Sequence, residues 1–243
     1  MTAGAVVRTA DIPGGRTAAG VRSRTVLDCG SEDGPGLVRR LVEIQPGSRF
    51  AGTAGSAGEL WFVIEGCGRL EIDGHSDLRL DPDHGLWIPP GAAYRLHANG
   101  SDGDDELRLD TVMLPGGTHS AAEAAEPLAR DLGDCEVETT GDRKFRVLFG
   151  PGRGCSVATQ FVGEIPPGRA PDHSHPYDEV VLVLAGEGTV HIGGAEHALS
   201  AGTCAHLPPG LLHCLENTGS TVMRVLGVFH PADSPAAKLE SQP

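Results

Sequence analysis

The sequence PPGRAPDHSHPYDEVVLVLAGEG, residues 166–188, places two histidines and a glutamate directly before an apolar run. That run has the length and the Val/Leu content of a buried strand. Alternate side chains of an extended chain share one face, so His173 and His175 point the same way. Glu179 would lie about 13 Å beyond His175 in a straight chain, at ~3.3 Å per residue. The intervening PYD favours a bend, which would aim all three side chains at a common point.

A further histidine, His213, follows a Pro-Pro-Gly turn in GTCAHLPPGLLHCLEN, residues 202–217, and opens a predicted strand that would run beside the others. Neutral imidazoles with one carboxylate suit divalent transition ions: Fe, Mn, Ni, Co, Cu or Zn. Four ligands on an octahedral ion leave two positions open, as catalytic sites do. The sequence therefore predicts one such ion per chain, of open identity, held by His173, His175, Glu179 and His213.

The remaining histidines lack this context and are interpreted as ordinary surface or strand residues. His119 is expected in an exposed loop. Tyr177 and His206 neighbour the cluster, and whether they line its pocket is left open.

An internal repeat with an offset of about 120 residues organises the chain. Three blocks recur in the same order and with nearly the same spacing. They are LVEIQPG (41–47) with FVGEIPPG (161–168), ELWFVIEGCGRLEI (59–72) with EVVLVLAGEGTVHI (179–192), and LWIPPG (86–91) with AHLPPG (205–210).

Each copy contains short β-rich runs separated by glycine and proline turns, and the chain has 35 Gly and 18 Pro. This pattern is typical of antiparallel all-β folds. Strands are predicted over 37–44, 59–65, 69–72, 86–88 and 107–113 in the first copy, and over 144–149, 155–164, 179–185, 189–192, 203–207 and 222–229 in the second.

The second copy resembles the two signature motifs of the cupin superfamily. The motif G-x5-H-x-H-x3,4-E-x6-G is similar to Gly168, His173, His175, Glu179 and Gly186, with one residue fewer than usual after Gly168. The motif G-x5-P-x-G-x2-H-x3-N is matched by Gly202, Pro208, Gly210, His213 and Asn217. The resemblance implies two tandem cupin barrels, jelly-roll-like double-stranded β-helices, with the three His and Glu179 as metal ligands and the other motif residues structural.

The first copy departs from these motifs. Thr53 and Gly55 stand at the positions of His173 and His175, Tyr94 stands at that of the third histidine, and only Glu59 remains. We therefore predict a metal-free, architectural first barrel. The expected organisation is an N-terminal arm (1–36), an N-terminal barrel (37–114), a linker with a helical turn or two (115–143), a metal-binding C-terminal barrel (144–230) and a flexible tail (231–243).

The composition of the chain limits the classes of partner that we expect. The net charge of −14 argues against nucleic acid and against an anionic membrane surface as partners. No segment has the ~18 apolar residues of a membrane span, and the N-terminus lacks a signal-peptide pattern. Six scattered cysteines are typical of reduced thiols. We expect a cytoplasmic homodimer that binds a small-molecule substrate.

Three functions compete. The first is a metal-dependent dioxygenase acting on a small enol, diketone or phenolic substrate, because cupins with three His and one Glu include quercetinase-like dioxygenases. The second is a non-oxidative isomerase, cyclase, lyase or decarboxylase, in which Glu179 is the catalytic general base. The third is a bicupin that binds a metal or small molecule without turnover.

Overall fold

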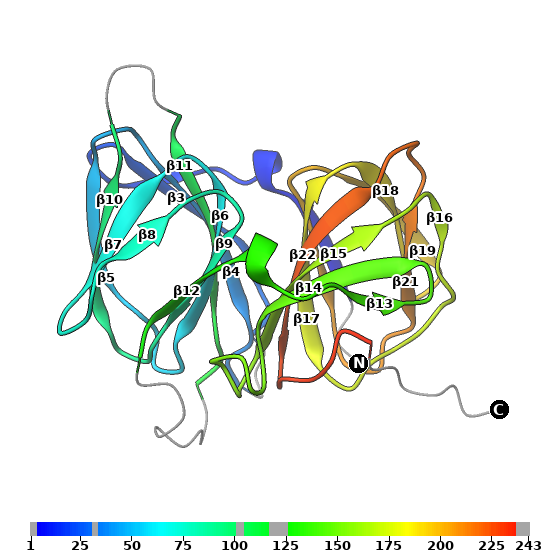
Figure 1. Ribbon diagram of the computed structural model, residues 1–243. Coiled ribbons are helices and arrows are strands. Elements are labelled where there is room, and N and C mark those ends of the chain that lie inside the picture. Colours follow the sequence, from blue (N-terminus) through cyan, green and yellow to red (C-terminus); the bar gives the residue numbers. More distant parts are fainter. Residues whose placement is uncertain (1–3, 31–33, 101–104, 117–125, 237–243) are drawn as a thin grey trace. The chain divides into compact units, whose positions relative to one another are not determined.

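The computed structural model of the protein describes residues 4–30, 34–100, 105–116 and 126–236 (Figure 1). Over these residues the fold is antiparallel β-structure with two short 3-10 turns, which confirms the predicted all-β class. No helix in this described part is long and apolar enough to cross a membrane.

The chain forms two compact units. We call the unit made of residues 12–134 and 152–156 the N-terminal barrel, and the unit made of residues 1–11, 135–151 and 157–243 the C-terminal barrel. Each contains a seven-stranded and a four-stranded sheet. The sheets of the N-terminal barrel have the orders β12-β9-β6-β11-β4-β3-β2 and β5-β10-β7-β8. Those of the C-terminal barrel have the orders β1-β20-β17-β22-β15-β14-β13 and β16-β21-β18-β19.

The two orders correspond strand for strand, so the sequence repeat is a repeat of topology. The N-terminal barrel consists of β2 (Gly15–Ala18), β3 (Val21–Asp28), β4 (Val38–Ile44), β5 (Arg49–Thr53), β6 (Glu59–Glu65), β7 (Gly68–Ile72), β8 (Leu78–Leu80), β9 (His84–Ile88), β10 (Ala93–Ala98), β11 (Leu107–Met113), β12 (Leu128–Asp131) and the turn η2 (Leu132–Asp134).

The C-terminal barrel begins with a strand from the start of the chain. It consists of β1 (Ala5–Arg8), the turn η1 (Thr9–Asp11), β13 (Glu138–Thr140), β14 (Arg143–Phe149), β15 (Thr159–Ile165), β16 (Gly168–Arg169), β17 (Asp178–Ala185), β18 (Glu187–Ile192), β19 (Ala195–Ser200), β20 (Thr203–Leu207), β21 (His213–Asn217) and β22 (Met223–His230).

These bounds differ from the organisation expected from the sequence. The segment 1–36 is not a separate arm, because β1 pairs with β20 while β2 and β3 extend the large sheet of the N-terminal barrel. Strand β3 buries Val21, Val26 and Leu27, which supplies the apolar contacts that hold it. Within the expected linker, residues 128–131 form β12. The expected helical turns fall largely on 117–125, which with His119 lie outside the described residues, as do residues 237–243 of the tail.

The core of the C-terminal barrel lies between its two sheets. Alternating residues of β17 and β18 point inward, and Val181, Val183, Val190 and Ile192 are buried there. Each such side chain contributes ~1.5–3 kcal/mol when it leaves water. Gly186 joins the two strands at a φ of 88°, a conformation that favours glycine. This packing fixes the strand faces, and hence the side from which Glu179 projects.

Candidate metal centre

The motif residues come from three neighbouring segments of the C-terminal barrel. Glu179 is the second residue of β17, His213 is the first residue of β21, and both motif histidines lie in the connection from β16 to β17. The backbones of His173 and His213 exchange two N–H···O bonds of 2.9 Å. The Gly210 N–H donates to the carbonyl of His175 at 2.9 Å, which ties the Pro-Pro-Gly turn to the same segment.

All three imidazoles are held in the same way through Nδ1. His175 Nδ1 lies 2.8 Å from the Tyr177 carbonyl, His213 Nδ1 lies 2.8 Å from the Leu211 carbonyl, and His173 Nδ1 lies 3.2 Å from that of Pro171. A carbonyl only accepts, so each Nδ1 carries the proton and each Nε2 keeps its lone pair. A hydrogen bond of this kind is the usual second contact of a metal-binding histidine, because it fixes tautomer and ring orientation.

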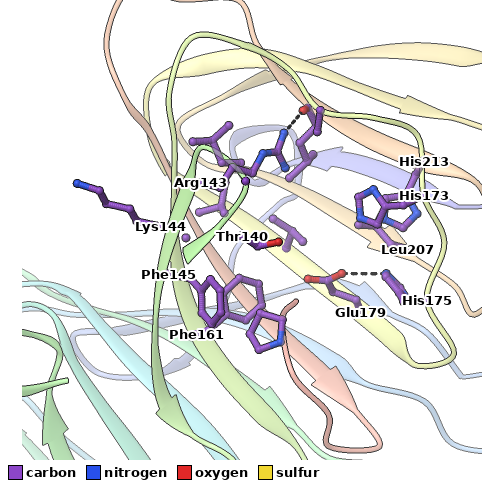
Figure 2. Close-up of a pocket in the computed structure, with 18 of the residues that line it drawn as sticks. Thr140, Arg143, Lys144, Phe145, Phe161, His173, His175, Glu179, Leu207 and His213 are labelled. Atoms are coloured by element: carbon purple, nitrogen blue, oxygen red, sulfur yellow. Dashed lines mark hydrogen bonds and ion pairs between the residues drawn. The ribbon is translucent and has the colours of Figure 1, made fainter. Parts of the chain in front are cut away.

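Three of the four predicted ligands converge. One donor atom from each of His175, Glu179 and His213 lies within 4.8 Å of the other two, and all three residues are buried. Two donors on opposite sides of one ion lie ~4.2 Å apart, so the spacing is close to what an ion requires. His173 stands at the edge of this group, partly exposed, with its ring centroid 4.6 Å from that of His213 (Figure 2).

The donor set fits a transition ion. The Nε2 atom of His175 is buried and receives no hydrogen bond from any described residue. Its neighbour is Oε2 of Glu179 at 3.0 Å, and a carboxylate oxygen does not donate a hydrogen bond, so a cation coordinated between the two atoms would satisfy both. Burial also lowers the pKa of His213 to about 4, so this imidazole is neutral at physiological pH, as a ligand must be.

Stacked aromatic rings hold the His175 side chain of the centre in place. The Tyr177 ring stacks on His175 with centroids 4.1 Å apart and on Phe229 with centroids 4.0 Å apart. Burial, with a smaller contribution from the Glu179 carboxylate, raises the pKa of Tyr177 far above its ordinary range, so the phenol stays neutral. This stack restricts the His175 ring to one orientation.

A cavity of about 240 Å³ opens onto the centre. Its walls are mainly apolar, and its cationic side chains are Arg143 and Lys144. The Arg143 guanidinium donates to the Leu215 carbonyl, whereas Lys144 extends away from the histidines (Figure 2). Tyr177 lines this cavity. Among the described lining residues His206 does not occur, and its Nε2 contacts Asp178 Oδ1 at 2.6 Å instead. The lining includes Phe145, Phe161, Ile165, Val181, Leu207, Leu215 and Val225.

Arg143 was not singled out from the sequence, because it falls at the end of the expected linker. Its alternation with Phe145 and Val147 on β14 is the one signal that could have placed it on the inner face of the sheet.

The N-terminal barrel has no equivalent centre among the residues that the structure describes. Glu59 accepts hydrogen bonds from the Gly55 N–H at 3.0 Å and from Trp61 Nε1 at 2.7 Å. Strand pairing places Gly52, not Thr53, opposite Tyr94, as His173 lies opposite His213. The repeat pattern placed Thr53 there because six residues lie between Gly52 and Glu59, whereas five lie between His173 and Glu179.

Comparison with known proteins agrees with this architecture. Residues 161–229 match the family model described as Cupin domain. No curated protein sequence matches the chain significantly. The similar solved structures include a variant of Bacillus subtilis oxalate decarboxylase, with a TM-score of 0.75, 14% identity and coverage of 96% of this chain and 78% of that one.

For two further solved structures, the match extends over more of the other protein's length. Escherichia coli YlbA, assigned to the family model DUF861, has a TM-score of 0.77 and 11% identity over 96% of this chain and 93% of that one. A Pseudomonas aeruginosa protein named as glyoxylate-induced has a TM-score of 0.76 and 16% identity over 100% of this chain and 90% of that one. At these identities the likeness shows the fold. The family match over residues 161–229, with the histidine–glutamate cluster inside that range, supports a metal-dependent cupin enzyme or binder, and the C-terminal barrel is a cupin domain.

Proposed function

We propose that the C-terminal barrel is a metal-dependent dioxygenase for small, largely apolar substrates with an enol, diketone or phenolic group. The observation that carries this proposal is the set of three imidazoles with protonated Nδ1 atoms, grouped with Glu179 beside an apolar cavity of about 240 Å³. His173, His175, Glu179 and His213 would hold the ion. A bound redox-active ion would supply the coupling between an electron-rich substrate and O2.

The chain's own residues would prepare the substrate. Phe161, Val181 and Leu207 provide an apolar wall that suits a ring or alkyl body and excludes water. Glu179 is placed to accept the enol or phenol proton on a carboxylate oxygen, which increases the negative charge on the substrate oxygen. Arg143, which lines the same cavity, would attract that charge. Both atoms of O2 would enter the organic product, so no separate reductant is needed.

A non-oxidative reaction is the second candidate, and the position of Glu179 favours it. Its Oε2 lies 3.0 Å from His175 Nε2, inside the centre, where it could move a proton in an isomerase, cyclase, lyase or decarboxylase reaction. Oxalate decarboxylase, which shares the fold, is a decarboxylase by name. The mainly apolar cavity favours the dioxygenase, because a small dicarboxylate would require more cationic side chains. A bicupin that binds without turnover is the third possibility.

Oxygen dependence separates these functions. Purified protein reconstituted with Fe, Mn, Ni, Co, Cu or Zn would be offered 2,4-pentanedione, catechol and a flavonol, with and without O2. The dioxygenase predicts turnover that needs O2, with ¹⁸O from ¹⁸O2 in the product, and loss of activity in Glu179→Gln. The exposed Glu196→Gln serves as the control. Undiminished turnover without O2 would point to the second candidate, and metal uptake without turnover of any substrate would point to a binder.

A further inference from the structure

The N-terminal barrel contains a cavity of about 450 Å³, compared with about 240 Å³ for the cavity beside the metal centre. Protein interiors are normally filled to crystal-like density, and voids well above the size of a water molecule are few. A cavity of this volume lies in the usual range for small-molecule sites. Its lining combines apolar rings with two arginines, the exposed Arg16 and the partly buried Arg40, and Arg40 faces the interior of the barrel. This combination is typical of a small-molecule site.

The strand register fixes the direction of Arg40. Residues directly opposite one another across paired strands share a face of the sheet. Arg40 lies opposite Thr25 on one side and Thr111 on the other, and Thr111 lies opposite Trp61. All of these side chains line the cavity, so they form one inward row across β3, β4, β11 and β6.

The same row in the C-terminal barrel is apolar. There, Val181 lies opposite Gly227, and Gly227 lies opposite Phe161. Arg40 therefore occupies the ladder position of Phe161. The barrel without a histidine cluster has a guanidinium where the barrel with the cluster has a phenyl ring.

The guanidinium of Arg40 has no hydrogen-bond or ion-pair partner among the described residues, and the side chain is only partly exposed. Glu59, the carboxylate that lines the same cavity, is already bound by the Gly55 N–H and Trp61 Nε1. A half-buried cation without a partner is unfavourable, and an anion in the cavity would relieve this cost. A negatively charged ligand would therefore complement the cavity.

Aromatic side chains close the cavity beside Arg40. The Tyr94 ring meets Trp61 edge to face, with centroids 4.9 Å apart, and lies 6.2 Å from the ring of Phe50. The Tyr94 hydroxyl has no hydrogen-bond partner among the described residues. Gly52 makes room for this group, since a Cβ there would lie 2.5 Å from the hydroxyl oxygen. An apolar body would pack on these rings, and the hydroxyl is available to a polar substituent.

We propose that the N-terminal barrel binds a small organic carboxylate, whose anionic end pairs with Arg40 and whose apolar body packs against Trp61, Phe50 and Tyr94. A bidentate Arg–carboxylate pair supplies orientation as well as affinity. This site is separate from the proposed metal centre, and it needs no metal. It gives the barrel that lacks the metal motif a binding role of its own.

The chain provides a reporter for this site. It has two tryptophans, and Trp61 lines the cavity whereas Trp87 does not. In a Trp87→Phe background the fluorescence therefore comes from Trp61 alone. Benzoate is the probe, and benzamide is its uncharged counterpart of nearly the same shape. Calorimetric titration of the unsubstituted chain repeats the measurement, so the result does not depend on how well Trp87→Phe folds.

We expect saturable quenching of Trp61 by benzoate, with at least ~10-fold weaker binding of benzamide. Arg40→Gln should reduce the affinity for benzoate to that for benzamide. Arg95→Gln is the matched control, because Arg95 lies beside Tyr94 on β10 but pairs with Asp73 at 3.0 Å and does not line the cavity. Its binding curve should be unchanged.

Two results would overturn the proposal. One is an absence of saturable benzoate binding by both methods up to ~20 mM, which is weaker than ordinary ligand affinity. The other is equal benzoate affinity in Arg40→Gln and the unsubstituted chain. His213→Ala, which removes a proposed metal ligand, should leave the Trp61 curve unchanged. Loss of binding in His213→Ala with retention in Arg40→Gln would place the anion at the metal centre instead, so the two proposals fail separately.

Discussion

The Nε2 atom of His175 lies 3.0 Å from Oε2 of Glu179, yet no described residue forms a hydrogen bond to that nitrogen. With its proton on Nδ1, His175 offers Nε2 only as an acceptor, and a carboxylate oxygen also only accepts, so neither atom donates to the other. This is the relationship expected of two ligands aimed at one cation rather than at each other. The proposed metal centre depends on this pair and on His213 beside it.

The ligands should differ in their contribution to metal affinity. His175 is 1% exposed and belongs to the converging group, whereas His173 is partly exposed and lies at its edge. We expect His175→Ala to abolish tight binding and His173→Ala to weaken it by ~10–100-fold, the range typical of losing a supporting contact. Competition with a chromogenic chelator measures both constants. Equal losses in the two variants would show that His173 is a full member of the group in the loaded protein.

The N-terminal barrel should not contribute to metal content. Glu59→Ala removes the acceptor of the Gly55 and Trp61 hydrogen bonds and should lower the free energy of unfolding by ~1–3 kcal/mol. The metal stoichiometry should stay the same, and it should also stay the same in Tyr94→Phe. Elemental analysis with urea denaturation separates the two effects. A loss of half the metal in either variant would mean that this barrel also holds an ion.

Metal-free protein should lose stability in mild acid. Burial lowers the pKa of His213 from 6.5 to about 4 in the folded state. Between these values the unfolded chain binds a proton that the folded chain does not, so the free energy of unfolding falls as the pH drops from 6.5 towards 4. The loss reaches ~3 kcal/mol at most. Urea denaturation of chelator-treated protein at several pH values measures it, and His213→Gln should flatten the curve. An equally steep curve in His213→Gln would assign the effect to another group.

The turn between β17 and β18 should tolerate no side chain. A Cβ at Gly186 would lie 2.8 Å from the Met223 Cα, whereas one at Gly194 would meet nothing within 4 Å. Both glycines have positive φ, 88° and 87°, so an alanine at either position carries the same backbone strain of ~1–2 kcal/mol. We expect Gly186→Ala to cost a further ~1–3 kcal/mol from the clash. Chemical denaturation compares the two variants, and equal costs would contradict the close approach.

The central strands could be predicted from the sequence because they are apolar and buried. Strands β4, β6, β11, β17 and β22 lie within a residue of the predicted ranges. By contrast, β5 and β19 carry mostly exposed residues, RFAGT and AEHALS, and pairing rather than local preference makes them strands. Strand β15 begins at Thr159 rather than at 155, since residues 155–158 follow the turn at 151–154 without pairing in the sheet.

Motif spacing identified the candidate ligands, because the chemistry of metal ligation restricts residue type and distance along the chain. It could not show that His173 lies at the edge of the group, since this depends on how the β16–β17 connection folds. Nor could it find Arg40 or Arg143, whose roles depend on which face of a strand points inward. That choice is made by cross-strand packing and is not encoded in the neighbouring residues.

Metal content measured in purified protein tests the proposed centre most directly. Inductively coupled plasma mass spectrometry should find about one transition ion per chain in the unsubstituted protein and in His197→Ala, whose histidine is exposed on β19. His213→Ala, with an unchanged circular dichroism spectrum, should retain less than about a tenth of that amount. Equal metal in His213→Ala and the unsubstituted protein would contradict the centre, as would failure of the unsubstituted protein to take up any of the six candidate ions.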